Sequence, residues 1–75
     1  MEEILERMRQ DPQADWNIED LVNVAKHFDV IVQRQQGYIV CSHPRLSITP
    51  TFSARRPIRV PVIRDFVDMI DSVRQ

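Results

Sequence analysis

Apolar residues recur at helical spacing in three stretches of the chain. A short stripe in residues 2–9 predicts a first helix, and a turn-like Asp-Pro segment follows it. A second stripe runs from about residue 18 to residue 28, and Asn17 stands just before it, where a side-chain oxygen can cap a helix. The third stripe extends from Pro61 to Val73, and proline suits the first turn of a helix. The pattern therefore predicts three helices.

Between the second and third helices the pattern changes to β-branched and alternating runs. Residues 30–34 and 38–42 predict two strands. Gly37, the only glycine, lies in the connection between them, where a chain reversal that needs a positive φ angle would use it. Residues 47–52 alternate apolar and polar side chains and predict a third strand, which Pro50 confines to an edge or to an irregular conformation.

These elements predict one small α+β domain. The order is helix, three-stranded antiparallel meander, helix, with residues 1–14 as an appended N-terminal arm and residues 15–75 as the core. Both main helices can cover the same face of the sheet. A chain of 75 residues buries only about 60% of the surface that its unfolded form exposes. We therefore expect chemistry, if any, on an open face and not in a large enclosed site.

The beginning of the chain is acidic, and no stretch approaches the roughly 18 apolar residues of a membrane span. We therefore expect neither secretion nor membrane insertion. Cys41 is the only cysteine, so it has no partner for a disulfide within the chain, which fits a reducing, cytoplasmic compartment.

The formal net charge of −1 conceals a strong segregation of charge along the chain. Residues 1–29 carry three basic and eight acidic side chains, and residues 65–75 carry one arginine and three aspartates. The six basic residues of the segment 30–64, which contains no acid, are all arginines: Arg34, Arg45, Arg55, Arg56, Arg59 and Arg64. The planar guanidinium group holds phosphate through two hydrogen bonds and stacks on bases. The middle of the chain is therefore predicted to bind an anionic polymer, most simply RNA.

Tyr38 is the aromatic candidate for such binding. Side chains alternate along a strand, so Tyr38 should share a face with Val40 and Ser42, opposite to Ile39 and Cys41. We expect Tyr38 on the open face, within reach of an arginine across the hairpin, where an exposed aromatic ring can stack on a base. The alternative is a tyrosine that only completes the surface of the sheet.

Five arginines complete the predicted RNA-binding set. Arg34 is the residue expected beside Tyr38 across the hairpin, and Arg45 follows the second strand. Arg55, Arg56 and Arg59 lie in a loop that leads into the N-terminus of the last helix, a position that suits phosphate. The alternative for this loop is a solvated charged surface without a ligand.

Candidates for catalysis and metal binding are few. His43 could act as a general acid or base, although its place before Pro44 at a strand end is also typical of a turn residue. The cysteine and the two histidines lack metal-ligand spacing, and no nucleophile triad, P-loop or dinucleotide motif is present. The sequence therefore predicts no metal and no cofactor.

Short motifs in a fixed order resemble a known family. DWNIED at residues 15–20, Ser-His-Pro at 42–44, ARRPI at 54–58 and Ile-Arg at 63–64 resemble a branch of the HicA toxins, small ribonucleases of bacterial toxin–antitoxin pairs. The resemblance covers roughly residues 15–73. It implies a double-stranded-RNA-binding-domain-like α-β-β-β-α fold, an activity that cleaves mRNA, and a HicB-like antitoxin protein as partner.

One position departs from that family. The Gly-Ser-His motif, whose histidine is catalytic in the family, falls on residues 36–38, so Tyr38 stands where the histidine would be. A phenol is a poor general base at neutral pH. His43 lies five residues away, about 16 Å along an extended strand and on the opposite face. The resemblance thus implies an RNA-binding protein whose ribonuclease activity is impaired, absent or dependent on Tyr38. The alternative is a non-enzymatic domain that uses its basic surface to bind an acidic protein.

Overall fold

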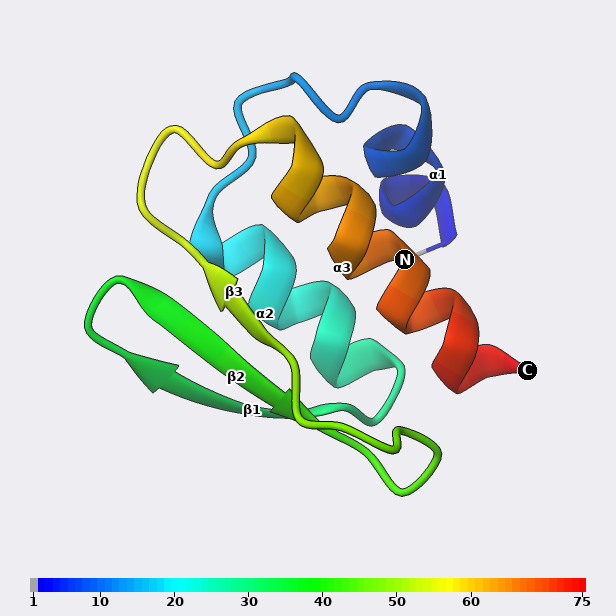
Figure 1. Cartoon of the computed structure of the whole chain (residues 1–75). Helices are drawn as coiled ribbons and strands as arrows, with labels where there is room; N and C mark the ends of the chain where they lie inside the picture. Colours follow the sequence, from blue (N-terminus) through cyan, green and yellow to red (C-terminus); the bar gives the residue numbers. More distant parts are fainter. Residues whose placement is uncertain (1) are drawn as a thin grey trace.

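The computed structural model describes residues 2–75, which form three helices and one antiparallel sheet (Figure 1). The elements are α1 (Glu2–Gln10), α2 (Ile18–His27), β1 (Ile31–Gln35), β2 (Tyr38–Ser42), β3 (Thr51–Ser53) and α3 (Val60–Arg74). The strands lie in the order β1-β2-β3, and α2 and α3 lie on the same side of the sheet (Figure 1). The predicted α+β class and the meander are confirmed.

Helix α2 has a defined signal at each end. The Asn17 side chain accepts the backbone N–H of Asp20, whose carboxylate accepts the backbone N–H of Asn17, and this reciprocal capping box stabilises the first turn. At the other end Asp29 has a φ angle of 64°. Its N–H donates to the carbonyl of Lys26, and the Val30 N–H donates to that of Ala25, the pattern of a Schellman motif. These signals fix where the chain leaves the helix layer and enters β1.

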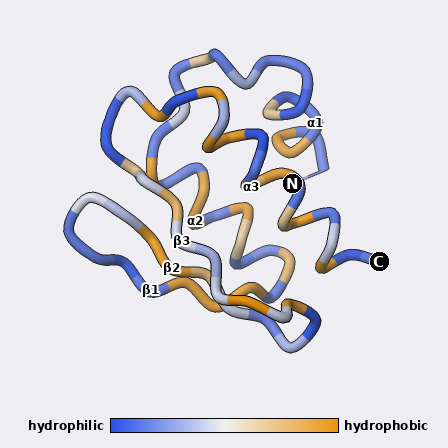
Figure 2. The backbone as a smooth tube through the Cα atoms, viewed as in Figure 1, coloured by the Kyte–Doolittle hydropathy of each residue, from blue (hydrophilic) through white to orange (hydrophobic). Residues whose placement is uncertain are grey.

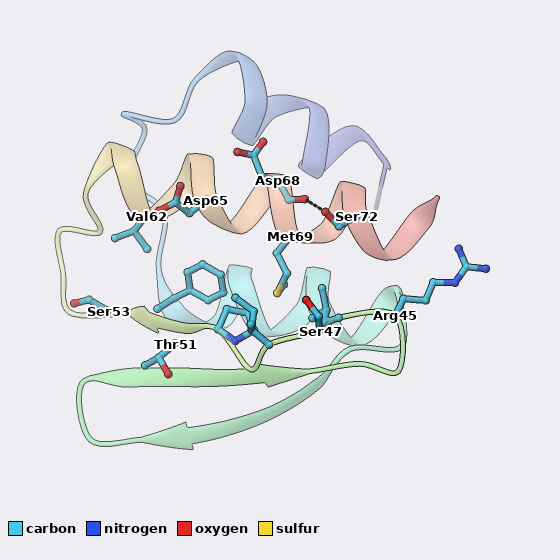
Figure 3. A pocket seen from close by; sticks show the side chains of 13 residues that line it. Arg45, Ser47, Thr51, Ser53, Val62, Asp65, Asp68, Met69 and Ser72 are labelled. Carbon is cyan, nitrogen blue, oxygen red and sulfur yellow. Dashed lines mark hydrogen bonds between the residues drawn. The ribbon is translucent and has the colours of Figure 1, made fainter.

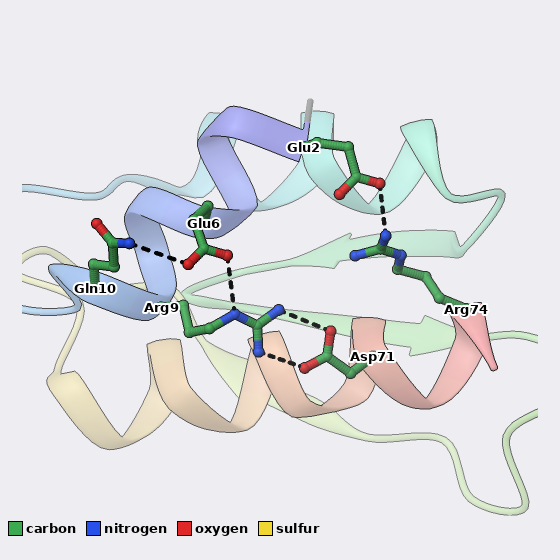
Figure 4. Close-up of polar contacts among 6 residues, drawn as sticks. All are labelled: Glu2, Glu6, Arg9, Gln10, Asp71 and Arg74. Carbon is green, nitrogen blue, oxygen red and sulfur yellow. Dashed lines mark hydrogen bonds and ion pairs between the residues drawn. The ribbon is translucent and has the colours of Figure 1, made fainter.

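Helix α1 belongs to the core. Leu5 and Met8 are fully buried, and α1 packs against α3. Arg9 also binds Asp71 of α3 through two hydrogen bonds, 2.7 Å and 3.0 Å long (Figure 4). Arg74 pairs with Glu2 at 2.7 Å. Residues 1–14 were interpreted as an appended arm, but α1 within this segment packs into the core.

The hydropathy pattern explains the layers. Hydrophobic and hydrophilic positions alternate along the helices (Figure 2), and the buried apolar side chains of the helices and the sheet form one cluster. Burying these apolar side chains is the dominant favourable term in folding, on the order of 25 cal/mol per Å² of apolar surface. No helix within residues 2–75 has the length and apolar character needed to cross a bilayer.

The third strand is shorter than predicted. The sequence pattern indicated residues 47–52, whereas β3 comprises only Thr51–Ser53. Residues 43–49 instead form turns and bends, in which the Leu46 N–H donates to the carbonyl of His43, and Ile48 is 70% exposed. Pro50 has no N–H for a strand ladder, so it contributes only its carbonyl, which accepts the Cys41 N–H at 2.9 Å.

Candidate nucleic-acid interface

Tyr38 begins β2 on the open face of the sheet. Ile39 and Cys41 are completely buried beneath the helices, whereas Tyr38 is 40% exposed. Across the sheet Tyr38 pairs with Gln35 of β1 and Ser53 of β3, and directly paired residues in antiparallel strands point to the same face. The alternation predicted for this strand is confirmed, and the phenol ring is accessible to a ligand.

Arg34 does not lie beside Tyr38, in contrast to the prediction. Its strand partner is Ile39, so its side chain points to the helix-covered side of the sheet and forms an ion pair with Glu19 at 2.8 Å. The reason is the length of the hairpin loop. Strand β1 continues to Gln35, which leaves a two-residue loop in place of the expected three, and a shift of one residue moves every side chain to the other face.

Arg55, Arg56 and Arg59 do gather. Together with Ser53, Pro57 and Val62 they line a hollow of about 220 Å³, which we call the arginine pocket. It lies where the chain leaves β3 and enters α3. Ser53 is the strand partner of Tyr38, so the aromatic ring and the pocket occupy the same end of the sheet.

The hairpin turn holds Arg55 in place. The Ala54 N–H donates to the carbonyl of Gly37 at 3.0 Å, which extends the pairing of β2 and β3 beyond Tyr38. The Arg55 side chain then lies across Gly37, and its Nε is 2.7 Å from the point where a Cβ would be. A residue without a side chain is thus required at this turn for contact as well as for its φ angle of 83°.

The pocket is electropositive and its cations are accessible. Arg55 and Arg59 form no ion pair within residues 2–75, and Arg56 pairs with Asp15 at 2.7 Å. Both partners of that pair are largely exposed, and exposed pairs of this kind contribute little, so an incoming anion can compete for Arg56.

Helix α3 begins at the same place. Arg59 is its N-cap, and its first turn contains no acidic residue, so the positive end of the helix dipole adds to the field of the guanidinium groups. The arrangement suits a phosphate group bound by several N–H donors at once.

Arg45 and His43 lie at the opposite end of β2 from Tyr38. Figure 3 shows Arg45 directed outward at one end of the 45–53 segment, with Ser53 at the other end. The Nδ1 atom of His43 accepts the backbone N–H of Arg45 at 3.0 Å, which is the behaviour of a turn residue. Neither side chain contributes to the arginine pocket.

Ser53, Pro57 and Val62 line the arginine pocket but were not among the predicted site residues, and Ser53 is the polar one of the three. Ser53 also pairs with Tyr38, but a serine in an irregular strand gives no chemical signal by itself. The register of β3 against β2 would have identified it.

Within residues 2–75 no three His, Cys, Asp or Glu side chains are grouped so as to hold a metal ion. No protein-family model matches the chain, and no curated protein or solved structure matches it.

Proposed function

We propose that this chain is a cytoplasmic, RNA-binding member of the HicA-like toxin type with a double-stranded-RNA-binding-domain-like core. The observation that carries the proposal is the gathering of Arg55, Arg56 and Arg59 around one hollow at the Tyr38 end of the sheet. In this role the guanidinium groups hold backbone phosphates and Tyr38 stacks on an unpaired base. The order α2-β1-β2-β3-α3, with both helices on one face, is compatible with the family's layout.

We expect its ribonuclease activity to be impaired, absent or dependent on Tyr38. In the alignment that the resemblance implies, Tyr38 stands at the position of the family's catalytic histidine. His43 belongs to a turn at the other end of β2. Loss of an imidazole general base removes a contribution of about two to four decades in rate. A HicB-like antitoxin is the protein partner that this assignment implies.

The second candidate function is the binding of an acidic protein. The observation in its favour is that Arg56 already holds a carboxylate, that of Asp15, at 2.7 Å. A partner's aspartates or glutamates could occupy the pocket in the same way.

The deciding experiment is fluorescence polarisation with a labelled single-stranded RNA of mixed sequence, titrated from low to moderate salt. We expect affinity to fall with salt at a slope of about −0.7 per phosphate contact. The double variant Arg55→Ala/Arg59→Ala should bind at least about tenfold more weakly, with a shallower slope. Arg34→Ala/Arg45→Ala removes the same charge elsewhere on the molecule and should bind nearly as the wild type does.

Three results would count against the proposal. Undetectable RNA binding at low salt would favour the acidic-protein function, and equal losses in the two double variants would mean that no specific pocket is used. We expect Tyr38→Ala to weaken the free energy of RNA binding by about 1–3 kcal/mol and Tyr38→Phe to leave it unchanged, because stacking needs the ring and not the hydroxyl. Robust RNA cleavage that survives Tyr38→Phe would contradict both the impaired site and a catalytic phenol.

A further inference from the structure

A second and larger hollow lies at the edge of the sheet, between β3 and α3. It has a volume of about 660 Å³ and is bounded by the 45–53 segment on one side and by one face of α3 on the other (Figure 3). Phe52 and Met69, each 6% exposed, and Val62 give it an apolar floor. Ile48, which is 70% exposed, lies at its lip. We call this hollow the β3–α3 groove.

The groove runs along an unpaired strand edge. β3 is the outermost strand, with β2 on its inner side. The Cys41 N–H bonds to the Pro50 carbonyl and the Ala54 N–H to the Gly37 carbonyl, so the even-numbered residues of this segment face β2. Hydrogen-bonding groups alternate along an antiparallel strand, and the backbone N–H and C=O groups of Thr51 and Ser53 therefore point outward. Both residues line the groove.

The α3 side of the groove is acidic. Asp65 and Asp68 line it, and neither carboxylate forms an ion pair with another residue in 2–75. Asp71, on the side of α3 that faces α1, is by contrast bound by Arg9. The acids beside the groove are thus available to a ligand, and Arg45 marks the far end of the same groove (Figure 3).

We propose that the β3–α3 groove binds an extended, basic segment of a partner protein, which adds to the sheet as a fourth strand beside β3. Main-chain hydrogen bonds to Thr51 and Ser53 would supply affinity, as in other cases of strand addition. An apolar side chain of the segment packs on Phe52 and Met69, and a neighbouring lysine or arginine pairs with Asp65 or Asp68. Nucleic acid is disfavoured here because its phosphates would face those carboxylates.

This site adjoins the arginine pocket but selects a ligand of the opposite charge, so the two proposals fail independently. A basic peptide is excluded from the arginine pocket by like charge, and an RNA is excluded from the groove. Ser53 and Val62 border both hollows, and for this reason neither of them is substituted in the test.

The probe is a fluorescein-labelled heptapeptide of alternating lysine and valine, compared with a glutamate–valine peptide of the same length. We expect the lysine–valine peptide to bind at least about tenfold more tightly than its acidic counterpart. Asp65→Asn/Asp68→Asn should weaken its binding by about tenfold or more, whereas the matched double variant Asp11→Asn/Asp29→Asn should stay within about twofold. Thr51→Pro removes one outward N–H without touching the inner ladder and should also weaken binding by about tenfold.

Amide resonances of the wild-type protein give an independent readout that needs no variant to fold. On saturation with the lysine–valine peptide, the Thr51 and Ser53 amides should shift and become protected from hydrogen exchange. Absence of binding at about 1 mM peptide would overturn the proposal, as would unchanged affinity in Asp65→Asn/Asp68→Asn. Peptide-induced shifts confined to β1 would place strand addition at the other edge of the sheet. If the wild-type protein self-associates and Thr51→Pro abolishes that self-association, the occupant of the groove is a second copy of this chain. Shifts confined to β1 and self-association of this kind would each overturn the assignment.

Discussion

The Nε atom of Arg55 lies 2.7 Å from the position that a Cβ atom would occupy on Gly37, so the hairpin turn and the arginine pocket share one contact. Gly37 also has a φ angle of 83°, which L-residues rarely adopt. Gly37 of the hairpin turn and Arg55 of the arginine pocket are thus coupled, although Gly37 precedes β2 and Arg55 follows β3.

We expect Gly37→Ala to lower the free energy of unfolding by at least about 1 kcal/mol, because of backbone strain and the clash with Arg55. Combining it with Arg55→Ala should recover the part due to the clash, and the double-mutant cycle in urea unfolding measures that coupling. Additive losses in the cycle would show that Arg55 does not pack on the turn. Gly37→Ala should also weaken RNA binding, since it displaces a guanidinium group of the arginine pocket.

The left-handed conformation of Asp29 offers a site for stabilisation. Its φ angle is 64°, and its carboxylate is next to the negative end of the α2 dipole. Asp29→Gly should therefore raise stability by about 0.5–1 kcal/mol, and Asp29→Asn by less, because asparagine removes only the charge. Thermal unfolding of the two variants and the wild type measures this order of stability, and we expect the melting temperature of Asp29→Gly to rise by a few degrees. A lower melting temperature for Asp29→Gly would contradict the Schellman-type end of α2.

Helix α1 should be necessary for stability. Met8 is fully buried between α1 and the rest of the core, so Met8→Ala should cost about 2–5 kcal/mol through lost contacts and a cavity. Gln10, on the exposed side of the same helix, provides the control: Gln10→Ala should change stability by less than about 0.5 kcal/mol. Urea unfolding of the two variants compares them directly. Similar midpoints would restore the interpretation of residues 1–14 as an arm.

In the β1–β2 hairpin, the sequence predicted the direction of some side chains and not of others. Strand alternation correctly placed Ile39 and Cys41 beneath the helices and Tyr38 on the open face. The same logic failed for Arg34, because alternation within a strand does not determine the length of the loop that sets the register between two strands.

The sequence also could not predict which charged residues form ion pairs with one another. The clustering of Arg55, Arg56 and Arg59 followed from their proximity in one loop, whereas the ion pair of Arg34 with Glu19 joins residues far apart in the chain. The β3–α3 groove likewise depends on how the irregular 43–50 segment folds, which no hydropathy period reports.

The ion pair between α1 and α3 predicts a specific acid sensitivity. The hydrogen bonds from Arg9 hold the pKa of Asp71 below its usual value, against the opposing effect of partial burial. A carboxyl whose pKa is lower in the folded than in the unfolded state contributes stability above the unfolded value, near 3.9, and loses it as pH falls through the folded value. Asp71→Asn should therefore be less stable than the wild type at pH 7, and the difference should shrink below about pH 4.

Chemical denaturation at a series of pH values measures this difference. Asp65→Asn is the control, because its carboxylate forms no ion pair within residues 2–75 and no interhelical contact is lost. A gap between wild type and Asp71→Asn that stays constant down to pH 2 would show that the Arg9 contact acts through packing and not through charge.

Cys41 should report on global opening of the fold. Its side chain is completely buried in β2, and burial raises the pKa of the thiol to about 11, so the thiolate is scarce at pH 8 even before access is considered. Reaction with a disulfide reagent should then be slower in the native protein than in urea by a factor on the order of a thousand or more, because it requires unfolding. The comparison variant Ser47→Cys/Cys41→Ala places the only thiol in an exposed loop and should react at nearly the unfolded rate in native buffer. Rapid native modification of Cys41 with the circular dichroism spectrum unchanged would mean that β2 opens locally beneath the helices, and the core would then lack the rigidity on which the positions of Tyr38 and the arginine pocket depend.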